Sequence, residues 1–377
     1  MVRIALDCRS VFPGMGGIGR YAAALAGTLP LTYKGAEFHF LVTERKEGPP
    51  LSEAQNACER RFVCGMIDER WEQLELPGEL AGIGADLYHS TCFSLPVAGG
   101  AKRTVATVHD VIFRRHPELV DEKLRVYLDK WTAVALDLAD AVITVSEFSK
   151  GEICKLYGAR PEKIRVVYNG VDPRFGQKPS AKKSREVAGR LKLPQRYVLY
   201  VGALEEKKNV ARLLAAWGQV TEQDSARGWK LVLAGGTGGK RGSFQETAEA
   251  ERVKDSTLFA GYVPDEDLPA LVANAGLFVY PSLYEGFGLP VLEAMAAGVP
   301  VVTSQTSSLG EVAGDAARLV DPESVDEMAE AMSELLGDKK LAQGLRKKGL
   351  SRAAEFTLER CARGTLAVYR GVLGEGR

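Results

Sequence analysis

Short runs rich in β-branched and aliphatic residues alternate with longer stretches of helical periodicity from one end of the chain to the other. Strands and helices that alternate in this way form parallel sheets with helices on both faces. The candidate strands are residues 2–7, 37–43, 86–90, 104–108, 141–145, 164–168, 196–202, 229–234, 256–260, 277–280, 300–303 and 317–320. The pattern predicts an α/β protein in which one doubly wound, Rossmann-like architecture is built twice.

The boundary between the two halves is expected near residues 173–195. This stretch contains Pro, Gly, Ser and the pair Lys182-Lys183, and it lacks strand periodicity until Tyr197. We therefore expect an N-terminal domain over residues 1–175 and a C-terminal domain over residues 176–355. Doubly wound sheets bind ligands at the carboxyl ends of their strands, so a central cleft faced by both domains is the expected site.

Charge and composition exclude several classes of protein. Lysine plus arginine and aspartate plus glutamate both total 49, which argues against a general nucleic-acid binder. No apolar run is long enough for a membrane span, and the N-terminus reads as a first strand rather than a signal peptide. The 6 cysteines are scattered and the 4 histidines lack metal-ligand spacing, so reduced thiols and no metal site are expected.

A glycine-rich segment, Gly14-Met15-Gly16-Gly17-Ile18-Gly19, matches the dinucleotide fingerprint G-x-G-x-x-G. The first strand ends near Asp7, so several residues separate it from the first glycine, whereas the fingerprint follows its strand directly. The alternative is a glycine loop at the start of a helix. Its amides around Gly16 and Gly17 would favour an anionic group.

The most informative segment follows the candidate strand 277–280. Gly286 and Gly288 lie in a turn that can expose backbone amides, and Pro290 lies where a helix would begin. Glu285 precedes the helix, and Glu293 lies one turn inside it among apolar neighbours. A buried carboxylate needs a hydrogen-bonding partner, and ribose or sugar hydroxyls would supply one.

The spacing Glu285-x7-Glu293 around Gly-Phe-Gly-Leu-Pro resembles the signature of retaining GT-B glycosyltransferases of family 4, with a motif style similar to its mannosyltransferase-like members. Nearly the whole chain resembles this family. The matching segments are Gly16–Gly19, Thr107–Asp110, Val145–Ser149, Tyr168–Asp172, Gly202–Asn209, Ser307–Val312 and Leu319–Pro322. The chain departs from many relatives in one place, because Ala203 replaces the arginine that often follows the glycine equivalent to Gly202.

The resemblance implies a role for each matching residue. Glu285, Lys208 and His109 are the expected catalytic residues: Glu285 grips the donor sugar, Lys208 neutralises the leaving diphosphate, and His109 contacts the sugar from the other domain. The residues expected to bind the donor are Gly16, Gly17, Gly202, Lys207, Gly286, Phe287, Gly288, Leu289 and Glu293, with Glu293 on the ribose. A terminal helix over residues 356–377 is implied to return to the N-terminal domain.

The implied activity is retaining transfer of a hexose, with mannose favoured, from GDP-mannose or a UDP-sugar to a glycan or lipid-linked acceptor, without a metal or other cofactor. The implied location is cytoplasmic, with peripheral association at the inner membrane face left open. Basic residues within 114–130 could face anionic lipid, although acidic neighbours favour a solvated helix. The alternatives are a catalytically silent nucleotide-sugar-binding protein and a GT-B phosphorylase or epimerase.

Overall fold

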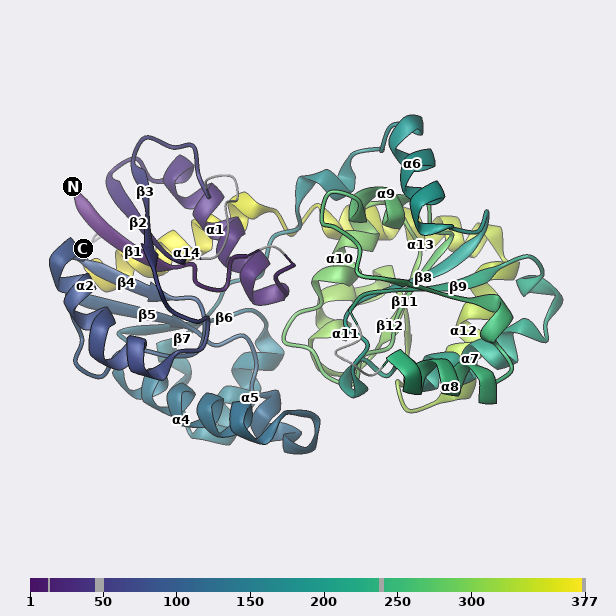
Figure 1. The fold of residues 1–377 in the computed structure, drawn as a ribbon, viewed down its shortest axis with the longest axis horizontal. Coiled ribbons are helices and arrows are strands. Elements are labelled where there is room, and N and C mark those ends of the chain that lie inside the picture. Colours follow the sequence, from purple (N-terminus) through teal and green to yellow (C-terminus); the bar gives the residue numbers. More distant parts are fainter. Residues whose placement is uncertain (13, 45–50, 237–240, 375–377) are drawn as a thin grey trace. The chain divides into compact units, whose positions relative to one another are not determined.

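The computed structural model describes residues 1–12, 14–44, 51–236 and 241–374 and divides into two compact units (Figure 1). Unit 1 comprises Met1–Gly170 together with the chain from Thr357 onward. Unit 2 comprises Val171–Phe356. Unit 1 is therefore discontinuous in sequence, because its last helix follows the whole of unit 2.

Unit 1 is built on a parallel sheet. Its described strands are β1 (Val2–Asp7), β2 (Ala36–Thr43), β3 (Ala57–Phe62), β4 (Leu87–Ser90), β5 (Arg103–Thr107), β6 (Ala141–Thr144) and β7 (Ile164–Val166). They lie in the order β3-β2-β1-β4-β5-β6-β7. The chain moves outward from β1 in both directions, and Ile4 lies opposite Phe38 on one side and Leu87 on the other. The β1/β4 junction is the topological switch point at which such sheets bind ligands.

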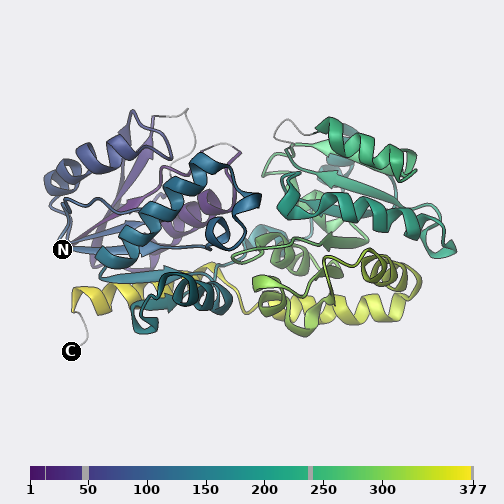
Figure 2. The ribbon, with the colours of Figure 1, turned by 90° about the horizontal axis from the view of Figure 1, so that it is seen from below.

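Helices cover both faces of this sheet (Figures 1 and 2). They are α1 (Gly17–Thr32), a π-helical turn (Trp71–Glu75) that continues into α2 (Leu76–Ile83), α3 (Ile112–Arg115), α4 (Glu122–Leu138), α5 (Glu147–Tyr157) and α14 (Leu358–Leu373). Helix α14 packs on α1 and on the sheet. It contributes Cys361, Leu366 and Tyr369 to the same buried core as Ile4 and Phe38.

Unit 2 repeats the architecture. Its described strands are β8 (Tyr197–Val201), β9 (Lys230–Ala234), β10 (Thr257–Gly261), β11 (Leu277–Tyr280), β12 (Val301–Ser304) and β13 (Arg318–Val320). All pair in parallel in the order β10-β9-β8-β11-β12-β13, which places the switch point between β8 and β11. Because β8 and β11 are neighbours, the loops that follow them meet at one edge of the sheet.

The helices of unit 2 also lie on both faces of its sheet (Figure 2). They are α6 (Ala181–Leu191), α7 (Val210–Thr221), α8 (Arg241–Ala250), α9 (Leu268–Ala273), α10 (Leu289–Ala296), α11 (Ser307–Ala313), α12 (Val325–Gly337) and α13 (Lys339–Ala353). Helix α7 packs against α8 and α12. Helix α10, which carries part of the predicted site, packs against α9, α11 and α13.

The predicted α/β architecture, built twice, is confirmed, and each predicted strand agrees with an observed one to within about two residues. Strand β3 was missed. Its sequence, Ala-Cys-Glu-Arg-Arg-Phe, has no β-branched residue and is half-exposed, because β3 is the edge strand beside β2. Among the helices that the structure describes, none combines the length and apolar character needed to cross a bilayer.

Candidate active site

The loop after β8 packs so closely on the loop after β9 that both loops need a glycine at the point of contact. The Gly202 amide donates to the Ala234 carbonyl at 2.9 Å, and a Cβ on Gly202 would lie 2.8 Å from the Tyr200 hydroxyl. A Cβ on Gly235 would lie 1.8 Å from the Gly202 carbonyl oxygen. The loops after β8 and β9 are therefore in backbone contact.

The loop after β8 is also tied to the turn after β11. The Lys207 carbonyl accepts hydrogen bonds from the Leu283 amide at 2.8 Å and from the Ser282 hydroxyl at 3.0 Å. The Asn209 amide group donates to the carbonyls of Pro281 at 3.1 Å and Pro322 at 2.6 Å. These hydrogen bonds fix the loop after β8 and the turn after β11 relative to one another.

Lys208, Tyr280 and Glu285 form a three-way contact at this edge of the sheet. The Lys208 ammonium donates to a Glu285 carboxylate oxygen and, at 3.0 Å, to the Tyr280 hydroxyl. The Tyr280 hydroxyl donates to the same carboxylate oxygen at 2.9 Å. The side chains of Lys208 and Glu285 are only 13% and 15% exposed, so the ion pair is largely withdrawn from solvent.

The electrostatics keep the two charged groups ionised. Burial acts to raise the pKa of Glu285, but the Lys208 charge and hydrogen bond outweigh it and leave that pKa below its usual value. Burial acts to lower the pKa of Lys208, but Glu285 outweighs it and raises that pKa. Burial and the Glu285 charge hold the pKa of the Tyr280 phenol well above its usual range, so it remains a neutral donor.

The turn between Glu285 and α10 is fixed by a glycine and a serine. Gly288 has φ 110°, and a Cβ there would lie 2.6 Å from the Leu309 side chain. The Ser308 hydroxyl contacts the carbonyls of Glu285 at 2.8 Å and Phe287 at 3.0 Å. The helix begins at Leu289 rather than at Pro290, so proline occupies its second position. Gly286 lies in the same turn.

Glu293 is buried in the middle of α10, 3% exposed, with Leu292, Ala294 and Met295 fully buried around it. The predicted burial of this carboxylate is therefore observed. Arg174, in the 3₁₀ turn Pro173–Gly176, pairs with Asp172 at 2.7 Å, and this hydrogen-bonded carboxylate raises the pKa of Arg174, with a smaller contribution from the charge of Glu293.

Lys207 pairs with a different carboxylate, although its charge also helps to lower the pKa of Glu285. Its ammonium lies 3.5 Å from the Glu205 carboxylate and the side chain is 32% exposed. The neighbouring lysines therefore have different environments: Lys208 is buried against Glu285, while Lys207 remains near solvent.

The remaining predicted site residues belong to unit 1. His109 follows β5, and its Nε2–H donates to the Thr91 carbonyl at 2.9 Å, while the rings of Tyr21 and Phe93 pack edge-on against it. Burial lowers the pKa of His109 to about 4, so the ring is neutral near pH 7. Gly16 and Gly17 are exposed at the start of α1, with open space where a Cβ would lie.

The structure thus brings Lys208, Glu285 and Tyr280 into direct contact within unit 2, and holds Gly202, Lys207 and the 286–289 turn on the same loops. Tyr280 was not predicted as a site residue. Its signal in the sequence was its place as the last residue of a strand, directly before the glycine turn.

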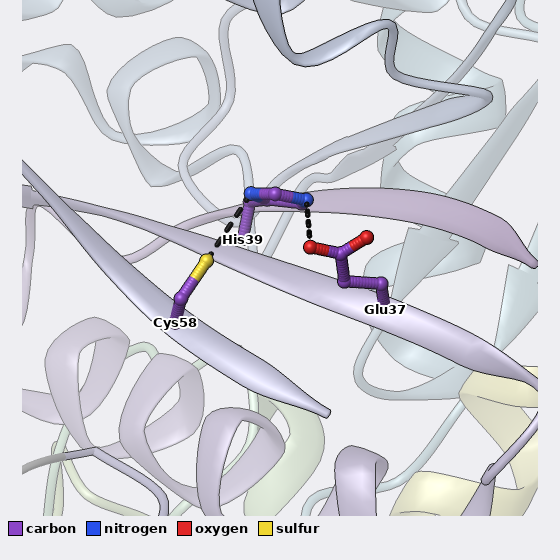
Figure 3. Close-up of side chains that lie close together, drawn as sticks. All are labelled: Glu37, His39 and Cys58. Atoms are coloured by element: carbon purple, nitrogen blue, oxygen red, sulfur yellow. Dashed lines mark hydrogen bonds and ion pairs between the residues drawn. The ribbon is translucent and has the colours of Figure 1, made fainter. Parts of the chain in front are cut away.

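A separate cluster lies on β2 and β3 of unit 1 (Figure 3). Cys58 Sγ and Arg60 Nε lie 3.2 Å and 3.1 Å from His39 Nδ1, while Glu37 approaches Nε2 at 3.2 Å. Glu37 and Cys58 therefore contact opposite ring nitrogens, and a guanidinium occupies the Nδ1 side. One metal ion could not bind all three groups in this arrangement. All six cysteines of the chain are free thiols.

Comparison with known proteins identifies relatives along most of the chain. Residues 182–352 match the family model for glycosyl transferases group 1, and residues 15–175 match that for glycosyltransferase family 4. The chain is 35% identical to O-antigen chain mannosyltransferase B of Escherichia coli over 285 residues, 75% of this chain and 74% of the relative. It is 32% identical to MMP alpha-(1->4)-mannosyltransferase of Mycolicibacterium hassiacum over 286 residues, 70% of this chain and 64% of the relative.

Among solved structures, the fold resembles that of the Anabaena protein HepE in complex with UDP-glucose. The TM-score is 0.74 at 20% sequence identity, covering 98% of this chain and 100% of HepE. The match extends across both units, and together with the sequence relatives it confirms the GT-B fold class. The chain belongs to the group 1 glycosyltransferases of family 4, and it is a hexosyltransferase.

Proposed function

We propose that this enzyme transfers mannose, with retention of anomeric configuration, from a nucleoside-diphosphate sugar to a glycan or lipid-linked acceptor. The observation that carries the proposal is the buried Lys208–Glu285 pair, bridged by Tyr280, where the loops after β8 and β11 meet. A cation and a carboxylate side by side suit a donor that combines an anionic diphosphate with a hydroxyl-rich sugar.

The leaving group acquires negative charge as the glycosidic bond breaks. Lys208 is protonated, and hydrogen bonds of the flanking Lys207 and Asn209 hold its loop, so it can stabilise that charge without a metal. The diphosphate would compete with Glu285 for the ammonium. The carboxylate, released from part of this contact, would then accept hydrogen bonds from the sugar, assisted by the amides of Phe287 and Gly288.

The nucleoside would be held by Glu293, whose buried carboxylate can accept two hydrogen bonds from ribose hydroxyls. From unit 1, neutral His109 would contact the sugar and the Gly16-Gly17 amides would face the phosphates. Gly202, Lys207, Gly286 and Leu289 complete the proposed donor site. We assign no enzyme nucleophile, so we propose that the acceptor attacks on the face from which the diphosphate leaves.

Mannose is favoured because both relatives are named mannosyltransferases. The Escherichia coli relative acts on O-antigen chains, which favours a polysaccharide or lipid-linked acceptor at the inner membrane face. We propose GDP-mannose as the donor. The UDP-glucose complex of HepE makes a UDP-sugar the alternative.

Thermal unfolding with GDP, UDP, GDP-mannose and UDP-glucose tests the donor. A ligand at 100 times its dissociation constant should stabilise the protein by about 2.7 kcal/mol. Stabilisation by GDP and GDP-mannose alone supports the proposal, whereas stabilisation by the uridine compounds alone overturns the assigned base. Release of GDP without and with added mannan oligosaccharides then separates a transferase from a catalytically silent binder, which would release none.

A further inference from the structure

A segment rich in basic residues, 178–196, lies near the start of unit 2. Its basic members are Lys178, Lys182, Lys183, Arg185, Arg190, Lys192 and Arg196, and its acidic member is Glu186. Because the whole chain carries 49 basic and 49 acidic residues, this segment is a local concentration of positive charge. Most of it lies on α6, which stands at the outer margin of unit 2 beside α9 (Figure 1).

A buried carboxylate fixes the orientation of α6. Asp267, at the start of α9, is fully buried and pairs with Lys183 at 2.6 Å and with Arg190. Val187 is buried in the core on this inner side of the helix. These contacts determine which basic residues turn outward.

Helical geometry places Lys182 and Arg185 on the side opposite Val187, since an α-helix has about 3.6 residues per turn. Lys178 and Lys192 flank the helix at its two ends. All four side chains are exposed, and within the described part of the chain none forms an ion pair with a carboxylate. We call these four residues the basic face.

The positive field extends beyond α6. Helices α9 and α13 both pack on α10, which places α6 and α13 on the same side of the sheet. The basic residues of α13 are Lys339, Lys340, Arg346, Lys347, Lys348 and Arg352, and the helix contains no acidic residue. Lys348 and Arg352 are paired with Asp315 and Glu355.

The basic segment within residues 114–130 of unit 1 differs in this respect. Arg114 lies 3.6 Å from Asp129, Arg115 lies 3.5 Å from Glu152, and Lys130 lies 2.7 Å from Glu69. These three charges are paired, and the remaining Lys123 and Arg125 follow the acidic residues Asp121 and Glu122 directly, whereas residues 178–196 contain a single acid, Glu186.

We propose that the basic face docks on a bilayer that contains anionic phospholipid. Unpaired exposed cations are attracted to the negative surface potential of such a membrane. Residues 178–196 present no exposed large apolar side chain, so the contact would be electrostatic and peripheral. They also lack exposed aromatic rings on which bases could stack, which disfavours single-stranded nucleic acid. The inference rests on charge geometry and goes beyond the proposed transfer reaction.

Sedimentation of the full chain with vesicles tests this proposal. We expect binding to vesicles of phosphatidylcholine with phosphatidylglycerol, loss of binding at high salt, and no binding to phosphatidylcholine alone. In the double variant Lys182→Glu/Arg185→Glu, partitioning should fall by at least about 25-fold, because each cation near such a surface contributes about fivefold. Lys182 lies in the first turn of α6, where an acidic residue is favourable, and the Arg185 side chain is exposed, so the variant should fold.

The matched control is Lys123→Glu/Arg125→Glu on α4, which makes the same charge change on the basic segment of unit 1. It should bind vesicles like the unaltered protein. The proposal is overturned if the α4 variant loses binding while the α6 variant retains it, or if vesicle charge makes no difference. It is also overturned if single-stranded DNA binds the basic face as tightly as vesicles do. Unchanged nucleotide-induced stabilisation of the α6 variant verifies that unit 2 remains folded.

Discussion

At the scale of single residues, the unliganded site neutralises itself: Lys208 and Glu285 satisfy one another and share the Tyr280 hydroxyl. Charge on the bridging oxygen of the donor grows only as the glycosidic bond breaks. The contact with Lys208 should therefore strengthen in the transition state, and it should lower the barrier more than it tightens ground-state binding.

The variant Lys208→Ala should therefore lose turnover by around a hundredfold or more, the usual effect of removing one preorganised electrostatic contact. Donor affinity should fall less. Steady-state turnover and calorimetric donor affinity measure the two effects, with folding checked by circular dichroism because Glu285 is left without its partner.

The adjacent residue supplies the control. Lys207→Ala removes a half-exposed cation that faces Glu205, so both turnover and affinity should change only mildly. If Lys207→Ala abolishes turnover while Lys208→Ala retains it, the roles of the two lysines are reversed.

His109 makes the stability of the fold dependent on pH. Its folded-state pKa of about 4 lies below the usual value near 6.5, so below pH 6.5 the unfolded chain binds more protons than the folded one. The contribution of neutral His109 to the free energy of unfolding is complete above about pH 6.5, and it is lost as the pH falls toward 4. Between pH 7 and pH 5 the loss should be about 2 kcal/mol.

Burial likewise lowers the pKa of His89, to about 3, so both histidines make the free energy of unfolding fall as the pH falls. Urea unfolding of the protein and of His109→Asn at the two pH values measures the effect. The variant should lose about 2 kcal/mol less on acidification. An equal loss in both proteins would contradict the assignment.

At the scale of elements, the glycine contact between the loops after β8 and β9 can be tested directly. In Gly235→Ala the new Cβ would lie 1.8 Å from the Gly202 carbonyl oxygen, and the residue has φ 152°. The loop that carries Lys208 should shift, so we expect donor affinity to fall by tenfold or more, equivalent to about 1.4 kcal/mol.

Gly236→Ala is the matched control, because nothing lies within 4 Å of its Cβ position and its φ is ordinary. Calorimetric titration with the nucleoside diphosphate compares the two variants. Equal affinities would show that the close contact at Gly235 does not support the loop that carries Lys208.

The sequence predicted most elements because buried parallel strands are continuous apolar runs that stand out from amphipathic helices. Strand β3 was not predicted, because an edge strand can be charged and half-exposed and then lacks the apolar run of a buried strand. The motif predicted Glu285 and Lys208 as site residues, but not their contact. The two residues are 77 positions apart, and they meet only because β8 and β11 are neighbours in the sheet. Tyr280 was not predicted as a site residue, because an aromatic residue in a strand usually belongs to the core.

At the scale of the whole molecule, the proposed donor contacts are divided between two units: Lys208, Glu285 and Glu293 lie in unit 2, while His109 and the Gly16-Gly17 loop lie in unit 1. If all of them bind one donor molecule, donor binding must fix the two units relative to one another. We expect the small-angle scattering profile with saturating donor to differ from the profile without it. Identical scattering profiles at full occupancy would contradict a donor site shared by both units.

The discontinuity of unit 1 has a consequence for how the polypeptide is made. The last helix, α14, supplies Cys361, Leu366 and Tyr369 to the first core, and the Tyr369 hydroxyl lies 2.6 Å from His89 Nδ1. During translation this core stays open until α14 leaves the ribosome, and by then the whole of unit 2 has already emerged. The half that is synthesised second is thus the first that can finish folding. A transcript truncated before the codons of α14 would yield a protein with a complete unit 2 and an incomplete unit 1.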